Sequence, residues 1–321
     1  MGTAANFTAG RTEMECEIPG ARLWRFELWD DNQYVPYFYN PALDADAQRL
    51  LFIGHRSGQE QAYLLTLDDD SVTQLTFAEG SRQHWSPYIR QDVSGIRPQF
   101  IAWTQPDWEA VVYWEDNTLC RVDTRTGTSQ RLFDLPGTVV PSVPHCSPLG
   151  WVSWGTIPRH LQERLKQGAS VPELESQLTS GCGFDVYDFD ADRPLLRVDT
   201  PFWPNHVAAS PDHRRILCCH EGSWTEQRMY VYDIEAKRLQ PLRTQEDEAR
   251  IGHEFWISSD LVGYHGSRDG RGFFGTIDVE TGTRTERLSQ ALDTQHYAHY
   301  HVSPDGRFVV TDGEVSRDSI S

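Results

Sequence analysis

The sequence predicts an all-β protein built as a β-propeller, and two recurring patterns support this prediction. Short apolar runs each end in an aspartate and a turn, and Ser-Pro or Ser-Asp pairs each precede a run rich in β-branched and aromatic residues. The aspartates stand at positions 68, 123, 188, 233 and 278, so the successive steps are 55, 65, 45 and 45 residues. A repeat of about 45 residues with four short strands is typical of one propeller blade, whereas a β-sandwich has no such spacing.

Each apolar run is expected to be a strand, because short runs of such residues between Asp, Gly and Pro turns favour extended structure. The runs that end in the repeated aspartate are Tyr63–Asp68, Leu119–Asp123, Phe184–Asp188, Met229–Asp233 and Phe274–Asp278. The serines of the second pattern are Ser86, Ser147, Ser210, Ser259 and Ser303. The step of 65 residues is explained by one helical insertion near 158–178, where Leu161 and Leu165 are one helical turn apart.

The repeats predict a single propeller domain over residues 1–321 with about six visible blades. The expected blades cover about 36–77, 78–135, 137–200, 202–244 and 250–290, with a partial blade over 295–321. Residues 12–30 also have the pattern of a strand, and they could complete a blade contributed by the other end of the chain. A partner subunit could fill the same gap, and the sequence leaves both alternatives and the oligomeric state open.

Composition excludes some classes of function. The chain has 29 Lys and Arg against 47 Asp and Glu, a formal net charge of −18, so we expect no nucleic-acid partner. We expect no membrane partner either, because no run approaches the roughly 20 apolar residues of a membrane span. The six cysteines are scattered without a Cys-x-x-Cys motif, which favours buried thiols and a cytoplasmic location. An acidic ligand would have to be held locally by Arg, His or a metal.

Six of the 12 histidines occupy one position of the repeat, just before the Ser-Pro or Ser-Asp pair. They are His84, His145, His206, His253, His299 and His301. Equivalent positions of different blades converge near the axis of a propeller, where gathered imidazoles suit a divalent metal or proton transfer. Alternation along a strand puts His299 and His301 on one face, able to chelate a metal. For any single histidine, a hydrogen bond to a neighbouring carbonyl is the alternative.

Two further candidates lie at strand ends, where propeller loops form sites. His220 ends an apolar strand and Arg228 precedes the next one. A solvated histidine and an ordinary surface ion pair are the respective alternatives.

Several segments, in order along most of the chain, resemble the oligogalacturonate lyase family. The more general matches are Tyr37-Phe38-Tyr39, Leu50-Leu51-Phe52, Tyr63-Leu64-Leu65, Thr73-Gln74-Leu75-Thr76 and Arg121-Val122-Asp123. The specific ones are Cys219-His220-Glu221-Gly222, Arg228-Met229, Gly252-His253-Glu254-Phe255-Trp256, and His299 ahead of Asp305-Gly306 and Asp312-Gly313. The resemblance implies a seven-bladed, manganese-dependent propeller that cleaves short, typically unsaturated, oligogalacturonides by β-elimination inside the cell.

The resemblance also implies roles for particular residues. The family's catalytic base corresponds to His253, its substrate-contacting arginine to Arg228, and one manganese ligand to His299. The family's other ligands belong to a Gln-x-x-His-x-His motif of the last blade, and no such blade precedes Ser321. The sequence His296-x-x-His299-x-His301 has that spacing with His in place of Gln, but its position matches the earlier ligand.

The prediction is therefore a lyase with Mn²⁺ or another divalent metal as cofactor and an acidic oligosaccharide as substrate. His206 and His220 are expected to contact substrate, and His301 is expected to join His299 on the metal. A binding or scaffold propeller without a metal, a degenerate lyase, and a metal-dependent epimerase or hydrolase acting on another uronate are the alternatives.

Overall fold

The computed structural model describes most of the chain in two compact units, Met1–Asp134 and Leu135–Ser321. The described residues are 6–17, 20–29, 33–56, 58–79, 81–83, 92–97, 99–170, 173–174, 181–221, 227–246, 249–269, 271–288, 299–303, 307–311, 314–316 and 319–320. None of the helices in these segments is both long enough and apolar enough to span a membrane. The assignment of one domain to residues 1–321 stays a prediction.

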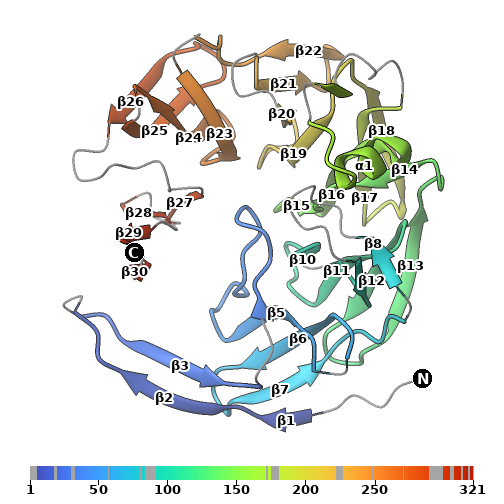
Figure 1. Cartoon of the computed structure of the whole chain (residues 1–321), viewed down its shortest axis with the longest axis vertical. Coiled ribbons are helices and arrows are strands. Elements are labelled where there is room, and N and C mark those ends of the chain that lie inside the picture. The colour runs from blue at the N-terminus through green and yellow to red at the C-terminus, as the bar shows by residue number, and fades with distance from the viewer. Residues whose placement is uncertain are drawn as a thin grey trace. The chain divides into compact units, whose positions relative to one another are not determined.

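The first unit is built from antiparallel sheets, coloured blue to green in Figure 1. One sheet has the strand order β1-β7-β6-β5-β4, another has the order β10-β11-β12-β13, and β2-β3 and β8-β9 form two-stranded pairs. The strands are β1 Asn6–Thr8, β2 Gly10–Met14, β3 Leu23–Glu27, β4 Gln33–Tyr34, β5 Arg49–Gly54, β6 Gln61–Thr66, β7 Ser71–Gln74, β8 Ser81–Gln83, β9 Asp92–Ser94, β10 Ile101–Trp103, β11 Ala110–Glu115, β12 Thr118–Asp123 and β13 Ser129–Asp134.

The second unit repeats one arrangement, in which consecutive strands pair in chain order (Figure 1). The sheets are β14-β16-β17-β18 with β15 paired to β16, then β19-β20-β21-β22, β23-β24-β25-β26, β27-β28 and β29-β30. The strands are β14 Val139–Pro141, β15 His145–Cys146, β16 Trp151–Pro158, β17 Gly183–Asp188, β18 Arg193–Asp199, β19 Pro204–Ala209, β20 Arg215–His220, β21 Met229–Asp233, β22 Arg238–Pro241, β23 Ala249–Trp256, β24 Leu261–Arg268, β25 Arg271–Asp278, β26 Arg284–Leu288, β27 Tyr300–Val302, β28 Val309–Thr311, β29 Glu314–Ser316 and β30 Ser319–Ile320. Four-stranded meanders of this kind are propeller blades.

The predicted helical insertion is present as α1, Arg159–Lys166, directly after β16. Leu161 and Leu165, the pair that predicted it, are buried. The helix therefore exists because one apolar turn packs against the sheet, as the i, i+4 spacing indicates.

The repeated aspartates of the sequence organise the turns that follow the third strand of a blade. Asp123 Oδ1 accepts hydrogen bonds from the backbone N–H groups of Arg125 and Thr126 at 2.9 and 2.7 Å. Asp278 makes the same pattern with Glu280 and Thr281 at 3.0 and 2.8 Å. A carboxylate that satisfies the N–H groups of its own turn is an Asx turn, which explains why the run ends in Asp.

The serines of the second pattern close the turn between the first two strands. The Ser147 N–H donates to the Trp151 carbonyl at 2.9 Å, and the Trp151 N–H donates back to Ser147 Oγ at 3.2 Å. Ser210 and Arg215 repeat this exchange at 2.8 and 3.0 Å. Ser86 lies outside the described residues.

Apolar side chains fill the space between successive sheets. In the second unit, the cluster between the β19–β22 and β23–β26 sheets consists of Leu217, Met229, Val231, Ala249, Ile251, Val262, Tyr264, Phe273 and Ile277. Each of these side chains is at most 2% exposed, so the two sheets pack face to face around a dry layer.

The N-terminal segment has two parts. β1 pairs with β7 and so adds an outer strand to the first sheet. β2 and β3, which lie largely within the predicted strand region 12–30, pair with each other from Gly10 opposite Glu27 to Met14 opposite Leu23. Completion of a blade with the other end of the chain stays a prediction.

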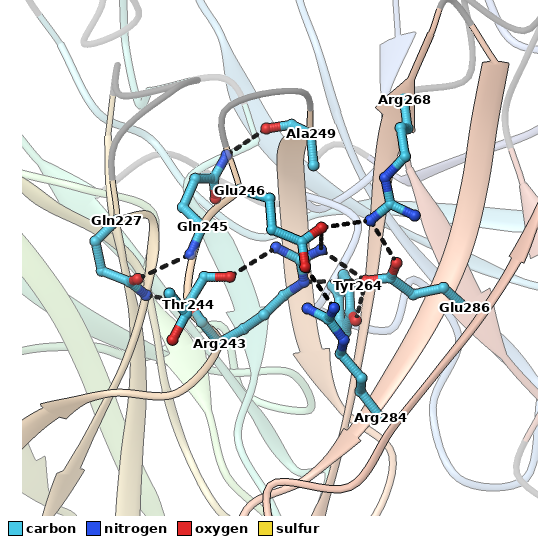
Figure 2. Close-up of polar contacts among 10 residues, drawn as sticks. All are labelled: Gln227, Arg243, Thr244, Gln245, Glu246, Ala249, Tyr264, Arg268, Arg284 and Glu286. Atoms are coloured by element: carbon cyan, nitrogen blue, oxygen red, sulfur yellow. Dashed lines mark hydrogen bonds and ion pairs between the residues drawn. The ribbon is translucent and has the colours of Figure 1, made fainter.

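A network of charges joins the segment between β22 and β23 to strands β24 and β26 of the next sheet (Figure 2). The side chain of Arg243, 1% exposed, donates from Nε and Nη2 to Glu286 Oε1 at 3.0 and 2.8 Å. Arg268 reaches Glu286 at 2.9 Å and the more exposed Glu246 at 2.8 Å, and Arg284 completes the network on Glu246 at 2.5 Å. The connection is thereby tied down beside Gln227, whose Nε2 donates to the Arg243 carbonyl.

Candidate active site

Two β-bulges carry histidines on the first strands of neighbouring sheets. The pairing of β19 with β20 shifts within 205–208, and the pairing of β23 with β24 shifts within 252–254. His206 and His253 lie at these irregularities with φ of 45° and 24°. Positive φ costs a residue with a Cβ about 1 kcal/mol, and bulges with such strain often re-aim a side chain at a functional site.

Four imidazoles come together, those of His253 and three neighbours. Its ring centroid lies 4.3 Å from that of His299, 5.0 Å from that of His265 and 5.1 Å from that of His206. The sequence predicted three of these four histidines and missed His265. His265 lies within β24, directly opposite Gly252, so its place beside His253 follows from strand pairing and has no counterpart in the Ser-Pro pattern.

Behind the histidines lies a buried ion pair. Glu254 is 1% exposed and follows His253 on β23. Its Oε1 is 2.9 Å from Nδ1 of His206, and its Oε2 is 3.4 Å from Nε of Arg228. Both partners are 2% exposed. The sequence predicts Arg228 and His206 as site residues, whereas Glu254 between them stands there only as part of a family motif.

The charges of this cluster set its protonation. Burial by itself would raise the pKa of Glu254, but the Arg228 cation and the His206 hydrogen bond outweigh it and lower that pKa to about 2. Burial lowers the pKa of His253 well below its ordinary value, and the neighbouring His206, His265, His299 and Arg228 act in the same direction. His253 is therefore a neutral imidazole with an available lone pair at pH 7.

A second carboxylate reaches the same arginine. Glu221 Oε2 lies 3.8 Å from Nη2 of Arg228 and accepts a hydrogen bond from Asn205 Nδ2 at 3.0 Å. The backbone N–H of His220 donates to the Arg228 carbonyl at 2.7 Å. The end of β20 and the segment that begins β21 thus hold Arg228 through both its side chain and its backbone.

His220, predicted to contact substrate, is 9% exposed and packs on an aromatic wall. Its ring centroid lies 4.9 Å from that of Phe202, which stacks in turn on Tyr230 at 4.5 Å. The substrate-contacting roles of His220 and His206 stay predictions.

The two histidines predicted as metal ligands face different neighbours. His299 lies against His253, whereas the ring centroid of His301 is 5.5 Å from that of Phe255. Nδ1 of His301 is 2.9 Å from the carbonyl oxygen of the adjacent Val302. The assignment of His299 and His301 to a metal stays a prediction. His145 lies in β15, where burial lowers its pKa to about 4, and His84 lies outside the described residues.

The donor chemistry distinguishes two possible places for a divalent metal. Within the described part of the chain, the group of potential ligands whose atoms lie within 4.8 Å of one another is His206, Cys219 and Glu254. This group does not fit manganese: burial raises the pKa of the Cys219 thiol, so it stays protonated, and Arg228 already neutralises Glu254. The imidazoles of His253 and its neighbours, His299 among them, are the donor type that a divalent ion accepts.

Comparison with known proteins defines the class first. No protein-family model matches the chain. A solved oligogalacturonate lyase in complex with manganese superposes with a TM-score of 0.80 at 21% identity, covering 98% of this chain and 80% of the other. Together with the four-stranded meanders, this confirms the predicted all-β propeller.

Two curated proteins are similar to the chain in sequence. The oligogalacturonate lyase of Dickeya dadantii is 23% identical over 297 residues, covering 86% of this chain and 68% of the relative. The oligogalacturonide lyase of Pectobacterium atrosepticum is 23% identical over 240 residues, covering 69% of this chain and 54% of the relative. The resemblance predicted from the sequence is confirmed: the chain is similar to the oligogalacturonate lyases in sequence and in fold.

Proposed function

We propose that this protein is a lyase that cleaves short oligogalacturonides by β-elimination, with His253 as the base and Arg228 as the clamp on a substrate carboxylate. The observation that carries the proposal is the position of His253, half-buried at the bulge of β23, with its ring among those of His206, His265 and His299. The adjacent carboxylate, Glu254, is neutralised by Arg228. The names of the curated relatives support the substrate class.

The reaction requires a base and a site for negative charge. Nε2 or Nδ1 of His253 would take the proton from the carbon next to the uronate carboxylate. The bond between the adjacent carbon and the oxygen that links it to the neighbouring sugar would break, and a C=C bond would form between these two carbons. The departing oxygen would then take a proton from solvent. A neutral imidazole suits this step, because it accepts a proton without first losing one.

Arg228 supplies the positive charge for a substrate carboxylate. Its planar guanidinium can hold a carboxylate through two hydrogen bonds, and its burial makes such a pair strong once formed. Because the side chain is only 2% exposed, binding requires the groups that cover it to move aside.

A divalent metal, manganese in the solved lyase complex, would be held by His299 with the predicted participation of His301. When bound, such an ion stabilises negative charge that develops on a uronate carboxylate.

The test is a product analysis. Digalacturonate and its unsaturated form are incubated with the purified chain, with and without Mn²⁺, and the products are separated by chromatography. The proposal expects the monomeric keto-uronate from wild type, at least a hundredfold less from His253→Gln, and wild-type amounts from His160→Gln, an exposed histidine of α1. Absence of turnover by folded, metal-supplemented wild type would leave the scaffold alternative standing. The cytoplasmic location stays a prediction that cell fractionation tests.

A further inference from the structure

Glu254 is the one carboxylate in the described site that touches two predicted functional side chains at once. Its side chain is 0% exposed, with Oε1 2.9 Å from the His206 ring and Oε2 3.4 Å from the Arg228 guanidinium. We propose that Glu254 is a positioning residue that fixes the direction of the Arg228 guanidinium for a substrate carboxylate and the tautomer of His206. This inference rests on the proposed function.

The geometry at Arg228 restricts its rotation. Glu254 meets Nε while Glu221 approaches Nη2, so two carboxylates bracket the guanidinium from one side. Glu254 is the stronger of the two, because its contact is shorter, 3.4 against 3.8 Å, and because it is fully buried while the side chain of Glu221 is 16% exposed. Removal of the Glu254 charge would take away the shorter and more buried of these two contacts, which is the one that meets Nε.

The geometry at His206 fixes a proton. A carboxylate oxygen only accepts hydrogen bonds, so a 2.9 Å contact to Nδ1 places the proton on Nδ1 and leaves Nε2 as an acceptor when the ring is neutral. The His206 ring lies 5.1 Å from the ring of His253. Glu254 therefore orients His206, which lies beside the proposed base His253, as well as Arg228.

Glu254 directly follows His253 in the chain. In the bulge within 252–254, Gly252 pairs with His265 and Glu254 pairs with Tyr264, so His253 stands between the two pairs. The bulge in β23 thus places the proposed base His253 in the site, and the next residue, Glu254, supplies the buried carboxylate that holds Arg228.

The test compares Glu254→Gln with a matched control, Glu286→Gln. Glutamine keeps the shape but removes the charge at each position. Glu286 holds the buried Arg243 in the same unit, so both variants lose a buried ion pair. Among the described residues, the polar partners of Glu286 are Arg243, Tyr264 and Arg268, none of which is a predicted site residue. The expected result is a KM for digalacturonate at least tenfold higher in Glu254→Gln and within threefold of wild type in Glu286→Gln. A merely structural loss lowers the folded fraction and thus the apparent kcat, and leaves KM unchanged.

A second substitution tests whether Glu254 acts through Arg228. In an Arg228→Lys background, Glu254→Gln is expected to raise KM less than threefold further, because the group it positions is already altered. Fully multiplicative effects of the two substitutions would overturn the inference.

A third measurement needs no turnover. The Arg228 Nε–H resonance, assigned by its loss in Arg228→Lys, is expected to shift and broaden in Glu254→Gln and to stay in place in Glu286→Gln. An unchanged resonance in Glu254→Gln overturns the inference whether or not the enzyme is active. Failure of wild type to cleave digalacturonate, together with a resonance that depends on Glu254, would instead reject the proposed function and retain the positioning role.

Discussion

The cost of Glu286→Gln can be worked out from the contacts of the charge network in Figure 2. The Glu286 carboxylate accepts two hydrogen bonds from Arg243, at 3.0 and 2.8 Å, one from Arg268 at 2.9 Å and one from the Tyr264 hydroxyl at 2.7 Å. Arg243 is almost fully buried, so the neutral amide leaves a buried cation without its main counter-charge. Breaking one half of a buried pair costs about 3–5 kcal/mol. Because Glu246 remains 3.9 Å from Arg243, we expect about 3 kcal/mol.

The assay is urea unfolding at pH 7, followed by tryptophan fluorescence. The matched substitution is Glu246→Gln, which removes the same charge from the same network at a side chain that is 42% exposed. Exposed ion pairs contribute at most about 1 kcal/mol and weaken in salt. In 0.5 M NaCl, where the electrostatic screening length is roughly 3–5 Å, the loss of unfolding free energy in Glu246→Gln should therefore shrink, while that in Glu286→Gln persists. Equal losses for the two variants, or equal salt sensitivity, would refute the reasoning.

Three further outcomes are expected. Gly155→Ala should lower stability by about 2 kcal/mol or more in urea unfolding, because its Cβ would lie 2.1 Å from a neighbouring backbone oxygen, whereas Gly137→Ala, with nothing within 4 Å, should change it by less than about 0.5 kcal/mol. Burial lowers the pKa of His213, which stacks on Trp151, to about 4, so the folded state binds fewer protons than the unfolded state. The contribution of the neutral His213 ring to the free energy of unfolding is complete above the unfolded pKa of about 6.5 and is lost as pH falls towards 4. In His213→Asn, the fall in the free energy of unfolding between these pH values should thus be smaller by about 1–3 kcal/mol. Finally, His299→Ala should weaken Mn²⁺ binding at least tenfold in titration calorimetry, and an unchanged affinity would remove His299 from the metal site.

The strands and turns could be predicted because their causes are local. Met229–Asp233 was predicted as a strand and is β21 to the residue, and the other four predicted runs overlap β6, β12, β17 and β25. An apolar run favours extension, and the aspartate at its end satisfies the N–H groups of the next turn, so the signal lies within a few neighbouring residues.

The chemistry of the site depended on contacts that sequence distance hides. The spacing of the repeat indicated that His206, His253 and His299 would meet, and their rings do lie together. It gave no sign of His265, which enters through strand pairing, because that residue stands at a different point of the blade. The bulges that give two histidines positive φ also have no local signature, since they depend on how each strand pairs with its neighbour.

Glu254 differs in burial from two other carboxylates that form ion pairs between the β19–β22 and β23–β26 sheets. Arg215 reaches Asp260 and Glu280 of the next sheet, and both of these carboxylates are 54% exposed, so water shares in their stabilisation. Glu254 is 0% exposed, so its charge is balanced by Arg228 and His206 within the protein. Apolar packing holds two sheets together without fixing direction, whereas a buried carboxylate constrains the orientation of each partner. That constraint lies one residue from His253, which is where a site that must align a base with a charged substrate has use for it.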